Sequence, residues 1–355
     1  MNIVDLIANE SSIITISRRG YIKRTAATEY RAQKRGGKGI KGAKSEEEDP
    51  IEHIFAASTH DYLLFFTTRG MVHWRKVHQL PALSRESRGR AIINIVPLED
   101  GENVAACRAI RNFDEEDHFL LMVPKNGLVK KTPLSAYGRP RSNGIIAVKL
   151  KEDDEIIDVL VAKKGDEIVL STVNGMAIRF RQSDARPMGR NTSGVKGISL
   201  TKGDSVVGMV VADPEATLLT ACEKGYGKRT DIEDYRITGR GGKGVKTLSV
   251  TEKTGALISI KDVTDENDLM IITKLGITIR MKMEDVRVMG RATQGVRLIK
   301  VRDKDDIASV AKVPKVDEEE EDLENGEGEE NTDITNETDT NTNNESNDES
   351  NNEEE

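Results

Sequence analysis

Six copies of one short pattern recur along this chain at intervals of about fifty residues. Each copy is an apolar run, a turn that ends in glycine and a second apolar run, followed in most copies by a basic residue. Successive turn glycines are 50, 57, 48, 50 and 51 residues apart, and they are Gly20, Gly70, Gly127, Gly175, Gly225 and Gly276. Repetition of this length indicates a fold built from units that pack on one another.

Two further landmarks recur within each unit. A second glycine lies 19 residues after the turn glycine in five units and 17 residues after it in the third, and these are Gly39, Gly89, Gly144, Gly194, Gly244 and Gly295. An acidic turn then leads into another apolar run, which begins at Ile51, Val104, Ile156, Val206 and Ile307. The units therefore share one internal order.

The residues around each turn glycine are typical of a β-hairpin. Asn126-Gly127 and Asn174-Gly175 match type I′ turns, in which both central residues have positive φ. GVKGISL after the second glycine predicts a third strand, and SVVGMVVA after the acidic turn predicts a fourth. No segment has a long 3.6-residue apolar period, so we expect an all-β fold. Six four-stranded units predict a six-bladed β-propeller or a close variant, because a single blade exposes too much apolar surface.

The formal net charge of −8 combines two parts of opposite sign. Residues 316–355 contain 19 Asp and Glu, no Lys or Arg and three apolar residues, so we expect a disordered acidic tail. Residues 1–315 contain all 53 Lys and Arg and the other 42 acidic residues, a net charge of +11. The sequence therefore predicts one basic repeat domain over 1–315 and a tail over 316–355.

Composition and residue spacing exclude several classes of protein. No apolar run approaches the about 18 residues that cross a membrane, and the first ten residues lack the features of a signal peptide, so we expect a cytoplasmic protein. Cys107 and Cys222 lie among apolar residues and are expected to be buried thiols. The five histidines are scattered without metal-ligand spacing. We therefore expect no metal and no cofactor.

Two glycine-rich stretches resemble nucleotide-binding motifs only in part. Gly37-x-Gly39-x-x-Gly42 has the spacing of a dinucleotide-binding turn, but no apolar helix follows it. Neither GGKGIKGAKS nor GRGGKGVKT has the residue order of a P-loop. Turn formation explains the paired carboxylates of the acidic turns, which include Asp153-Asp154 and Asp305-Asp306.

Basic residues recur in register at two positions of the unit. The position four residues after the turn glycine holds Arg24, Trp74, Lys131, Arg179, Arg229 and Arg280. The position fifteen residues after it holds Arg35, Arg85, Ser142, Arg190, Arg240 and Arg291. In a ring of blades, both positions are predicted to form a cationic rim, which suits neutralisation of phosphates with little dependence on base sequence. Glycine-rich loops also let backbone N–H groups approach phosphate oxygens.

The aromatic residues favour duplex DNA over a single strand as the ligand. The position ten residues after the turn glycine holds tyrosine in three units and an aliphatic residue in the others, and its occupants are Tyr30, Leu80, Tyr137, Ala185, Tyr235 and Val286. This alternation is typical of a core position. It is not typical of the stacking platforms that bind single strands.

The stretch Gln33-Lys34-Arg35-Gly36-Gly37-Lys38-Gly39 resembles the box of the C-terminal DNA-wrapping domain of the bacterial DNA gyrase A protein, usually Q-R-R-G-G-K-G. Similar words are THDYLLFFTTRG, VKKT, MGRNTSGVKGI, GYGKRT and GRATQGV, so the resemblance covers 1–315, and the acidic tail is also similar. Lys34 replaces the first Arg of the box, which keeps the charge and loses the planar fork. The corresponding protein of DNA topoisomerase IV generally lacks or degrades the box.

The resemblance implies a six-bladed β-pinwheel, a propeller variant whose blades exchange a strand, with duplex DNA bent around its basic perimeter. In the family, this wrap lets a type IIA topoisomerase introduce negative supercoils with ATP hydrolysed by gyrase B. The implied partners are duplex DNA, the gyrase A breakage-reunion domain and gyrase B, with no membrane partner. The resemblance also implies a monomeric isolated domain at the bacterial nucleoid. The breakage-reunion part and its catalytic tyrosine are absent from this sequence, so we expect that this chain alone neither cuts DNA nor hydrolyses ATP.

The residues predicted to bind DNA come from two sources. The resemblance assigns the box on the first blade, which is Gln33, Lys34, Arg35, Gly36, Gly37, Lys38 and Gly39. The pattern of basic loop residues adds Lys41, Lys44, Arg85, Arg88, Arg90, Arg139, Arg141, Arg190, Lys196, Arg240, Lys243, Lys246, Arg291 and Arg297. No residue is predicted to be catalytic or to bind a metal.

Other interpretations stay open at this point. A propeller can serve as a scaffold for protein–protein interaction on the chromosome, and a topoisomerase IV-type C-terminal domain would carry similar repeats. A propeller enzyme would need polar residues on the strands that line the central channel, where the apolar runs offer few. The acidic tail is hypothesised to compete with phosphate for the rim, or to act only as a solubilising segment.

Overall fold

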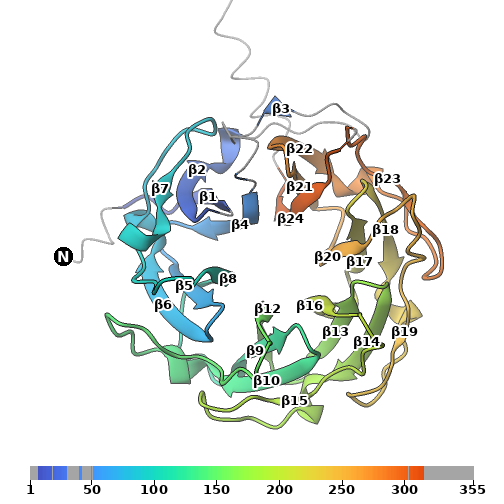
Figure 1. The fold of residues 1–355 in the computed structure, drawn as a ribbon, viewed down its shortest axis with the longest axis horizontal. Helices are drawn as coiled ribbons and strands as arrows, with labels where there is room; N and C mark the ends of the chain where they lie inside the picture. Colours follow the sequence, from blue (N-terminus) through green and yellow to red (C-terminus); the bar gives the residue numbers. More distant parts are fainter. Residues whose placement is uncertain are drawn as a thin grey trace, which may run out of the picture. The chain divides into compact units, whose positions relative to one another are not determined.

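The computed structural model describes residues 7–17, 19–29, 40–41, 49, 51–302 and 304–315 (Figure 1). The chain divides into two units, Met1–Val316 and Asp317–Glu355, and all described residues belong to the first. The predicted disorder of residues 316–355 lies outside the described residues.

The strands of the described residues form six four-stranded sheets, which are the blades of a ring (Figure 1). From the centre outward, the first three blades are β4 (Ile51–Ser58), β1 (Ser11–Ser17), β2 (Tyr21–Ala26), β7 (Arg90–Ala91); β8 (Val104–Ile110), β5 (Tyr62–Thr67), β6 (Met71–Lys76), β11 (Ile145–Ile146); and β12 (Ile156–Lys163), β9 (His118–Pro124), β10 (Leu128–Pro133), β15 (Val195–Lys196). The other three are β16 (Val206–Val211), β13 (Glu167–Thr172), β14 (Met176–Arg181), β19 (Val245–Lys246); β20 (Leu257–Val263), β17 (Thr217–Cys222), β18 (Tyr226–Asp231), β23 (Val296–Arg297); and β24 (Ile307–Pro314), β21 (Asn267–Thr273), β22 (Ile277–Lys282), β3 (Ile40–Lys41). The predicted all-β propeller of six four-stranded blades is confirmed.

Helical structure in the described part of the chain is limited to short 3-10 turns. Most of them follow the second hairpin strand of a blade, and they are η2 (Ala27–Glu29), η3 (Val77–Gln79), η4 (Ile92–Asn94), η5 (Leu134–Tyr137), η6 (Gln182–Asp184), η7 (Ile232–Asp234) and η8 (Met283–Asp285). None of these turns has the length and apolarity that a membrane-crossing helix needs.

Each blade takes its outermost strand from the next unit of the sequence. β15 follows the hairpin β13–β14 along the chain, yet it pairs with β10 of the preceding blade, where Val129 lies opposite Val195. The predicted third strand of each unit is therefore present but only two residues long, and it belongs to the neighbouring blade. This exchange agrees with the resemblance to a β-pinwheel.

The same exchange closes the ring. β3 comes from the first unit and pairs with β22 of the sixth blade, where Ile277 lies opposite Lys41 (Figure 1). An apolar cluster fills the junction between the sixth and first blades, and its members are Ile13, Ile51, Ile54, Met270, Ile272, Ala311 and Val313. Strand pairing and packing thus join the two ends of the repeat array.

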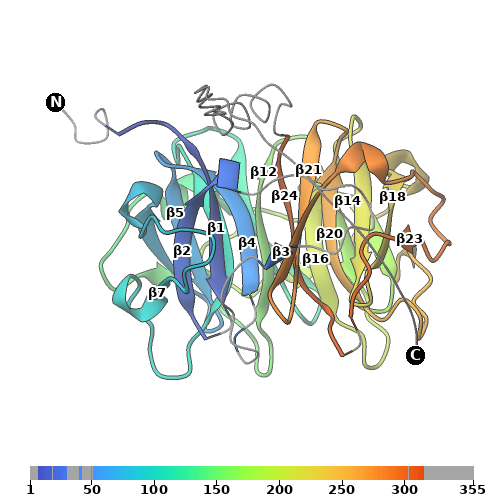
Figure 2. The same cartoon turned by 90° about the horizontal axis from the view of Figure 1, so that it is seen from above.

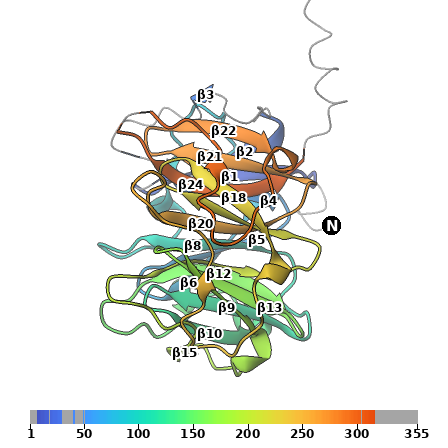
Figure 3. The same cartoon turned by 90° about the vertical axis from the view of Figure 1, so that its right-hand side faces the viewer.

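The hydrophobic core lies between the blades. Along β5, Leu63 and Phe65 pack toward the first blade, while Leu64 and Phe66 pack toward the third. Both faces of such a strand are buried, which explains its continuous apolar run; each side chain of this size contributes about 1.5–3 kcal/mol on burial. Viewed from the side, the strands run roughly along the axis of the ring, so the interfaces extend through its depth (Figures 2 and 3).

The hairpin turns differ from the predicted type I′. Gly127 has a φ of 83° and Gly175 a φ of 80°, but neither Asn126 nor Asn174 has a positive φ. The N–H of Gly127 donates to the carbonyl oxygen of Pro124 at 3.2 Å, and the same bond recurs in the other five units. Glycine therefore ends a three-residue loop in the left-handed conformation, and the residue before it is unconstrained. This explains why the other units have Arg, Lys or Leu there.

The acidic turns bind the hairpin turns of the same unit. Asp154 Oδ1 accepts the N–H of Asn126 at 3.1 Å, and Asp305 Oδ1 accepts the N–H of Leu275 at 3.1 Å. Each of these carboxylates also accepts the N–H of the residue that follows it. The interpretation of these carboxylate pairs as turn residues is confirmed.

The position ten residues after the turn glycine is a core position, as predicted. Tyr137 and Tyr235 are 0% and 1% exposed, and the aliphatic residues at the same position are buried as well. The hydroxyl of Tyr137 donates to the carbonyl oxygen of Ala147 at 3.1 Å. Tyr30 lies outside the described residues.

The two cysteines are free and buried, as predicted. Burial raises the pKa of the Cys222 thiol to about 12 and raises the pKa of Cys107 further. Both thiols therefore stay protonated at neutral pH, which makes them poor nucleophiles.

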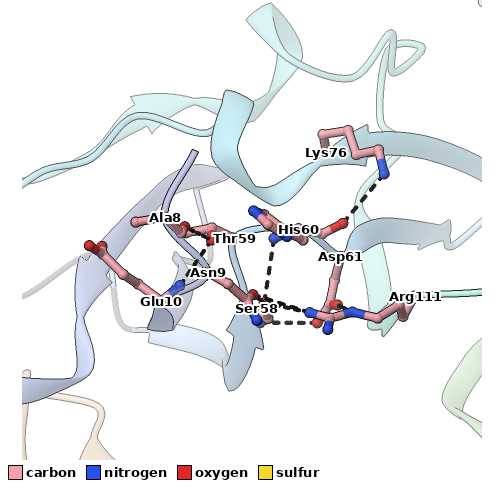
Figure 4. A network of polar contacts seen from close by, with 9 residues as sticks. All are labelled: Ala8, Asn9, Glu10, Ser58, Thr59, His60, Asp61, Lys76 and Arg111. Atoms are coloured by element: carbon pink, nitrogen blue, oxygen red, sulfur yellow. Dashed lines mark hydrogen bonds and ion pairs between the residues drawn. The ribbon is translucent and has the colours of Figure 1, made fainter. Parts of the chain in front are cut away.

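The first described residues lie against the turn between β4 and β5 (Figure 4). Thr59 Oγ1 accepts the N–H of Glu10 at 3.1 Å. The guanidinium of Arg111 lies 3.0 Å from Asp61 Oδ1 and donates to Asn9 Oδ1 at 3.2 Å. This network joins the segment before β1 to the second blade.

Candidate nucleic-acid interface

The long outer loops of units two, four, five and six are each held at both of their ends by the preceding blade. In the fifth unit, Ile237 forms a parallel bridge with Arg179 of β14, and the loop returns as β19, where Val245 lies opposite Ala177. The same parallel bridge attaches the loops of units two, four and six. Because β7, β15, β19 and β23 lie at the outer edge of the ring, the loop apices are carried on its perimeter (Figure 1).

In the described loops, the second glycine of the unit makes this return possible. Gly194 has a φ of 97°, and a Cβ there would lie 2.5 Å from the carbonyl oxygen of Val129. Gly244 has a φ of 75°, and its Cβ would collide with the carbonyl oxygen of Ala177. Only glycine tolerates both the backbone conformation and the close approach. The glycines of these loops therefore have a structural cause in strand exchange, besides any contact with phosphate.

Three of the arginines fifteen residues after the turn glycine are fixed on the outer strands. Arg190 donates to the carbonyl oxygen of Ile146 in β11 at 3.1 Å, and Arg240 donates to that of Lys196 in β15 at 2.9 Å. Arg291 donates to the carbonyl oxygen of Lys246 in β19 at 3.2 Å. Arg85 instead donates to the carbonyl oxygen of Glu29, at 3.2 Å. All four are half-buried, so each guanidinium is oriented by a backbone carbonyl oxygen and keeps part of its surface in solvent.

Most other predicted residues that the structure describes are exposed on the same loops. Arg88 lies over the ring of Tyr21, with its guanidinium carbon 4.0 Å from the ring centroid. Arg297 donates to the hydroxyl of Tyr226 at 3.0 Å, and this hydrogen bond lowers the pKa of that tyrosine. The exposed residues of the predicted set are Arg88, Arg90, Arg139, Arg141, Lys196, Lys243, Lys246 and Arg297.

The box is not among the described residues. Gln33, Lys34, Arg35, Gly36, Gly37, Lys38 and Gly39 all lie outside them, as does Lys44. Only the backbone of Lys41 is placed, in β3 at the outer edge of the sixth blade. The box therefore belongs to the segment that leads from the first blade to the strand that closes the ring.

In five of the six units the position four residues after the turn glycine does not belong to the rim, contrary to the prediction, while Arg24 of the first unit is half-buried. Lys131, Arg179, Arg229 and Arg280 are each 3–6% exposed, and Trp74 is equally buried. Arg179 Nε donates to Glu167 Oε2 at 2.7 Å, and its Nη1 donates to the carbonyl oxygen of Ile232 in η7 at 2.9 Å. These side chains bind the 3-10 turn of the next blade, so their recurrence reflects packing between blades.

Three buried lysines were not predicted from the sequence. They lie three residues after the turn glycine, are 0–2% exposed, and are Lys23, Lys130 and Lys228. The signal that could have found them is register, because the same position of the unit holds Ile178 and Ile279 in two other units, which is typical of a core position. Their ammonium groups contact backbone carbonyl oxygens.

The channel strands carry more charge than the apolar runs predicted. Arg108 of β8 forms an ion pair with Asp158 of β12, and Asp158 also accepts the N–H of Met209 at 3.2 Å. Lys312 of β24 lies 2.6 Å from Asp262 of β20. Each pair joins two innermost strands of different blades, which gives these charges a structural role.

The sequence matches the family model described as DNA gyrase C-terminal domain, beta-propeller. The match consists of six segments, one for each unit, and they are residues 11–58, 61–111, 118–163, 166–213, 216–264 and 267–314. Each segment begins within one residue of the start of the first hairpin strand of its unit. It ends within two residues of the end of the innermost strand.

Two proteins with similar sequences are both DNA gyrase A subunits. DNA gyrase A from Halalkalibacterium halodurans is 50% identical over 306 residues, which is 86% of this chain and 37% of that protein. DNA gyrase A from Clostridium acetobutylicum is 43% identical over 300 residues, 84% of this chain and 36% of that protein. The chain thus spans a little over a third of the length of these relatives.

Solved structures show the same architecture. A DNA gyrase A C-terminal domain superposes with a TM-score of 0.78 at 23% identity, covering 85% of this chain and 99% of the other. The C-terminal domain of a DNA topoisomerase IV superposes with a TM-score of 0.67 at 28% identity, covering 90% and 99%. The relatives and the solved structures agree with the six-segment match, which establishes that the chain belongs to the family of DNA gyrase A C-terminal domains.

Proposed function

We propose that residues 1–315 form a domain that binds duplex DNA without sequence preference and bends it around the outer edge of the ring. Its body carries a net charge of +11, counted over those residues. Phosphate neutralisation by such a surface is electrostatic and independent of base sequence. The name of the relatives supports a nucleic-acid partner, because DNA gyrase acts on DNA.

One observation carries this proposal. Arg190, Arg240 and Arg291 occupy the same place on three consecutive outer edges, each bound to a carbonyl oxygen of an exchanged strand. The same loops carry exposed lysines and arginines. Each cation contributes to binding only where a phosphate meets it, because that contact releases counterions. Cations repeated along a curved perimeter therefore favour DNA whose backbone follows the same curve.

In the intact enzyme, we place this domain beside the DNA gate. DNA bent by the domain would be presented for strand passage by the breakage-reunion part of gyrase A, with gyrase B as the ATP-hydrolysing partner. In this scheme the chain supplies the wrap, and the chemistry belongs to the remainder of the enzyme. We assign the box, Gln33 to Gly39, to the first part of the wrap. The acidic tail, residues 316–355, is proposed to be a segment separate from this domain.

A salt titration tests the binding. The affinity of the chain for linear duplexes of two unrelated sequences is measured at several salt concentrations. Six or more phosphate contacts predict a log–log slope of about −5 or steeper, equal for both sequences. A flat response, or a strong preference for one sequence, would contradict the proposal and favour a protein-interaction scaffold.

Ligation of nicked circles tests the bending. Circles closed by ligase with the domain bound should differ in linking number from circles closed without it, because a wrapped path changes the writhe that the ligase seals. Circles closed with an equal amount of a basic protein that does not bend DNA serve as the control. Binding without any shift in linking number would remove wrapping from the proposal.

A further inference from the structure

A buried lysine of the first blade contacts the loop of the second unit that carries Arg85, which we call the arginine loop of that unit. Lys23 of β2 is 2% exposed. Its Nζ donates to the carbonyl oxygens of Ser84 at 3.1 Å and Ser87 at 2.7 Å, and also to that of Arg85. The three donors of one ammonium group are thus matched by three acceptors at the apex of a single loop.

The fifth blade repeats this arrangement. Lys228 of β18 is 0% exposed, and its Nζ donates to the carbonyl oxygens of Gly290 at 2.6 Å and Arg291 at 2.5 Å. Two residues later, Thr230 Oγ1 donates to the carbonyl oxygen of Met289 at 2.9 Å. In the first blade, the equivalent Thr25 Oγ1 donates to the carbonyl oxygen of Leu83, in the loop of the second unit, also at 2.9 Å. The Lys and the Thr of the motif Lys-Arg-Thr therefore donate hydrogen bonds to the backbone of the loop that carries Arg85 or Arg291.

Other blades show that the blade itself does not need the lysine. The same position holds Ile178 in the fourth blade and Ile279 in the sixth, and both are buried in apolar clusters. In the third blade, Lys130 donates to the carbonyl oxygen of Ala147 in its own unit, at 2.5 Å. Two blades therefore fill this position with an apolar residue, and the loop of Arg240, which lies on Ile178, lacks a lysine support.

The two ammonium groups titrate close to neutral pH. Burial lowers the pKa of Lys23 to about 8; Glu29 raises it and Arg85 lowers it. Burial lowers the pKa of Lys228 to about 8, with Asp234 raising it, Arg291 lowering it and the buried Cys222 a minor influence. A neutral amine has two donors and a lone pair, so deprotonation of Lys23 leaves one of its three carbonyl oxygens facing a lone pair. Deprotonation of Lys228 removes the positive charge from its two hydrogen bonds, which weakens them.

We propose that Lys23 and Lys228 are positioning residues for DNA binding, whose ammonium groups hold the backbone of the neighbouring unit's arginine loop in the shape that receives a phosphate. This inference rests on the proposed function. DNA bound at Arg85 or Arg291 adds negative charge beside the ammonium group, which favours its protonated form. Binding of DNA and binding of these two protons are therefore coupled.

The coupling has opposite signs for stability and for DNA affinity. The folded-state pKa of about 8 is below the usual value of about 10.4 for lysine. From about pH 8 upward, the folded protein therefore binds fewer protons at these lysines than the unfolded chain does. Because of this difference, the two lysines make the stability of the folded state rise with pH. DNA prefers the protonated form, so affinity falls over the same range. Unfolding cannot produce a loss of affinity that accompanies a gain of stability.

Loop positioning is tested without DNA, by amide hydrogen exchange of the full chain. In Lys23→Met, residues 84–87 should exchange faster than in the parent protein at pH 7, and in Lys228→Met the same holds for residues 289–291. The matched loop around Arg240, which packs on Ile178, should be unchanged in both variants. Unchanged exchange of residues 84–87 and 289–291 in folded variants would overturn the positioning role.

The coupling is tested by calorimetry of duplex binding at pH 8 in two buffers with different ionisation enthalpies. The parent protein should take up protons on binding, and its affinity should fall about tenfold between pH 7 and pH 9. The double variant Lys23→Met/Lys228→Met should show less uptake and a flatter profile, whereas Lys202→Met, which removes an exposed lysine, should keep both. If the parent protein bound DNA without proton uptake, the coupling would be overturned. If the parent protein did not bind DNA, the proposed function would be overturned. In that case the hydrogen-exchange experiment would still test whether the two lysines hold the loops.

Discussion

Arg280 Nε lies 2.8 Å from Asp268 Oδ2 in the sixth blade, and the two side chains are 2% and 1% exposed. The equivalent arginines of the fourth and fifth blades also meet carboxylates, with Arg179 bound to Glu167 and Arg229 bound to Asp265 at 2.6 Å. A recurrent cation within a strand is thus an element of the fold, and its repetition alone does not identify a binding surface.

Breaking this pair should destabilise the domain strongly. Arg280→Ala leaves the Asp268 carboxylate buried without its partner, and we expect a loss of about 3–5 kcal/mol in the free energy of unfolding. The double replacement Arg280→Met/Asp268→Leu removes both charges and should recover most of that loss. Urea unfolding measures both. If the single variant lost less than the double, the pair would not have the role assigned to it.

Gly244 should be essential to strand exchange. Gly244→Ala forces a side chain into the left-handed conformation and against the carbonyl oxygen of Ala177, so we expect a loss of about 1–3 kcal/mol and faster hydrogen exchange in β19. The matched control is Gly239→Ala in the same loop, where a Cβ meets nothing within 4 Å. Equal effects of the two substitutions would contradict this account of the second glycine.

The exposed lysines of the rim should act on DNA affinity through phosphate alone. Replacing Lys243 by Ala is expected to weaken binding to all duplexes alike and to reduce the salt slope by about one unit. Arg179→Lys, a change at a buried position, should leave the slope unchanged at a temperature where the variant is folded. The measurement is the salt titration of duplex affinity, and a sequence-dependent effect of Lys243→Ala would argue against a phosphate contact.

The sequence predicted the architecture well because its landmarks are backbone requirements. Ile51, Val104, Ile156, Val206 and Ile307, expected to begin the last strand of a unit, are the first residues of β4, β8, β12, β16 and β24. Turn glycines and acidic turns are local features, and they mark the same places in the fold as in the sequence. The turn type was wrong because Asn-Gly is compatible with two loops, and only the hydrogen bond of Gly127 to Pro124 distinguishes them.

The site was harder to predict, since register does not reveal what a charged side chain faces. Arg179 and Arg190 recur equally well along the sequence, yet one is buried against Glu167 and the other lies on the outer edge. The difference arises from strand exchange, which places the loop of each unit against the preceding blade. The acceptors of Lys228 were unpredictable for the same reason, because they are 62 and 63 residues away in the sequence.

The box should matter more for bending than for binding. In Arg35→Ala/Lys38→Ala, the other loops still offer phosphate contacts, so we expect a modest loss of affinity and a much smaller linking-number shift in ligated circles. Lys243→Ala is the control, because it also removes a rim charge but lies on another blade. A double variant whose linking-number shift equals that of the parent protein would contradict the role assigned to the box by resemblance.

The acidic tail should oppose DNA binding if it competes with phosphate. It brings 19 negative charges to a body of +11 on the same chain, and tethering gives them a high effective concentration. A chain that ends at Lys315 should therefore bind duplex DNA more tightly at low salt, and the difference should shrink as salt screens both interactions. A variant with the acidic residues of 317–355 changed to their amides keeps the length of the tail and isolates its charge. If that variant and the full chain bound equally well at low salt, the tail would be solubilising only, and the positive charge of the rim would act on DNA without an internal competitor.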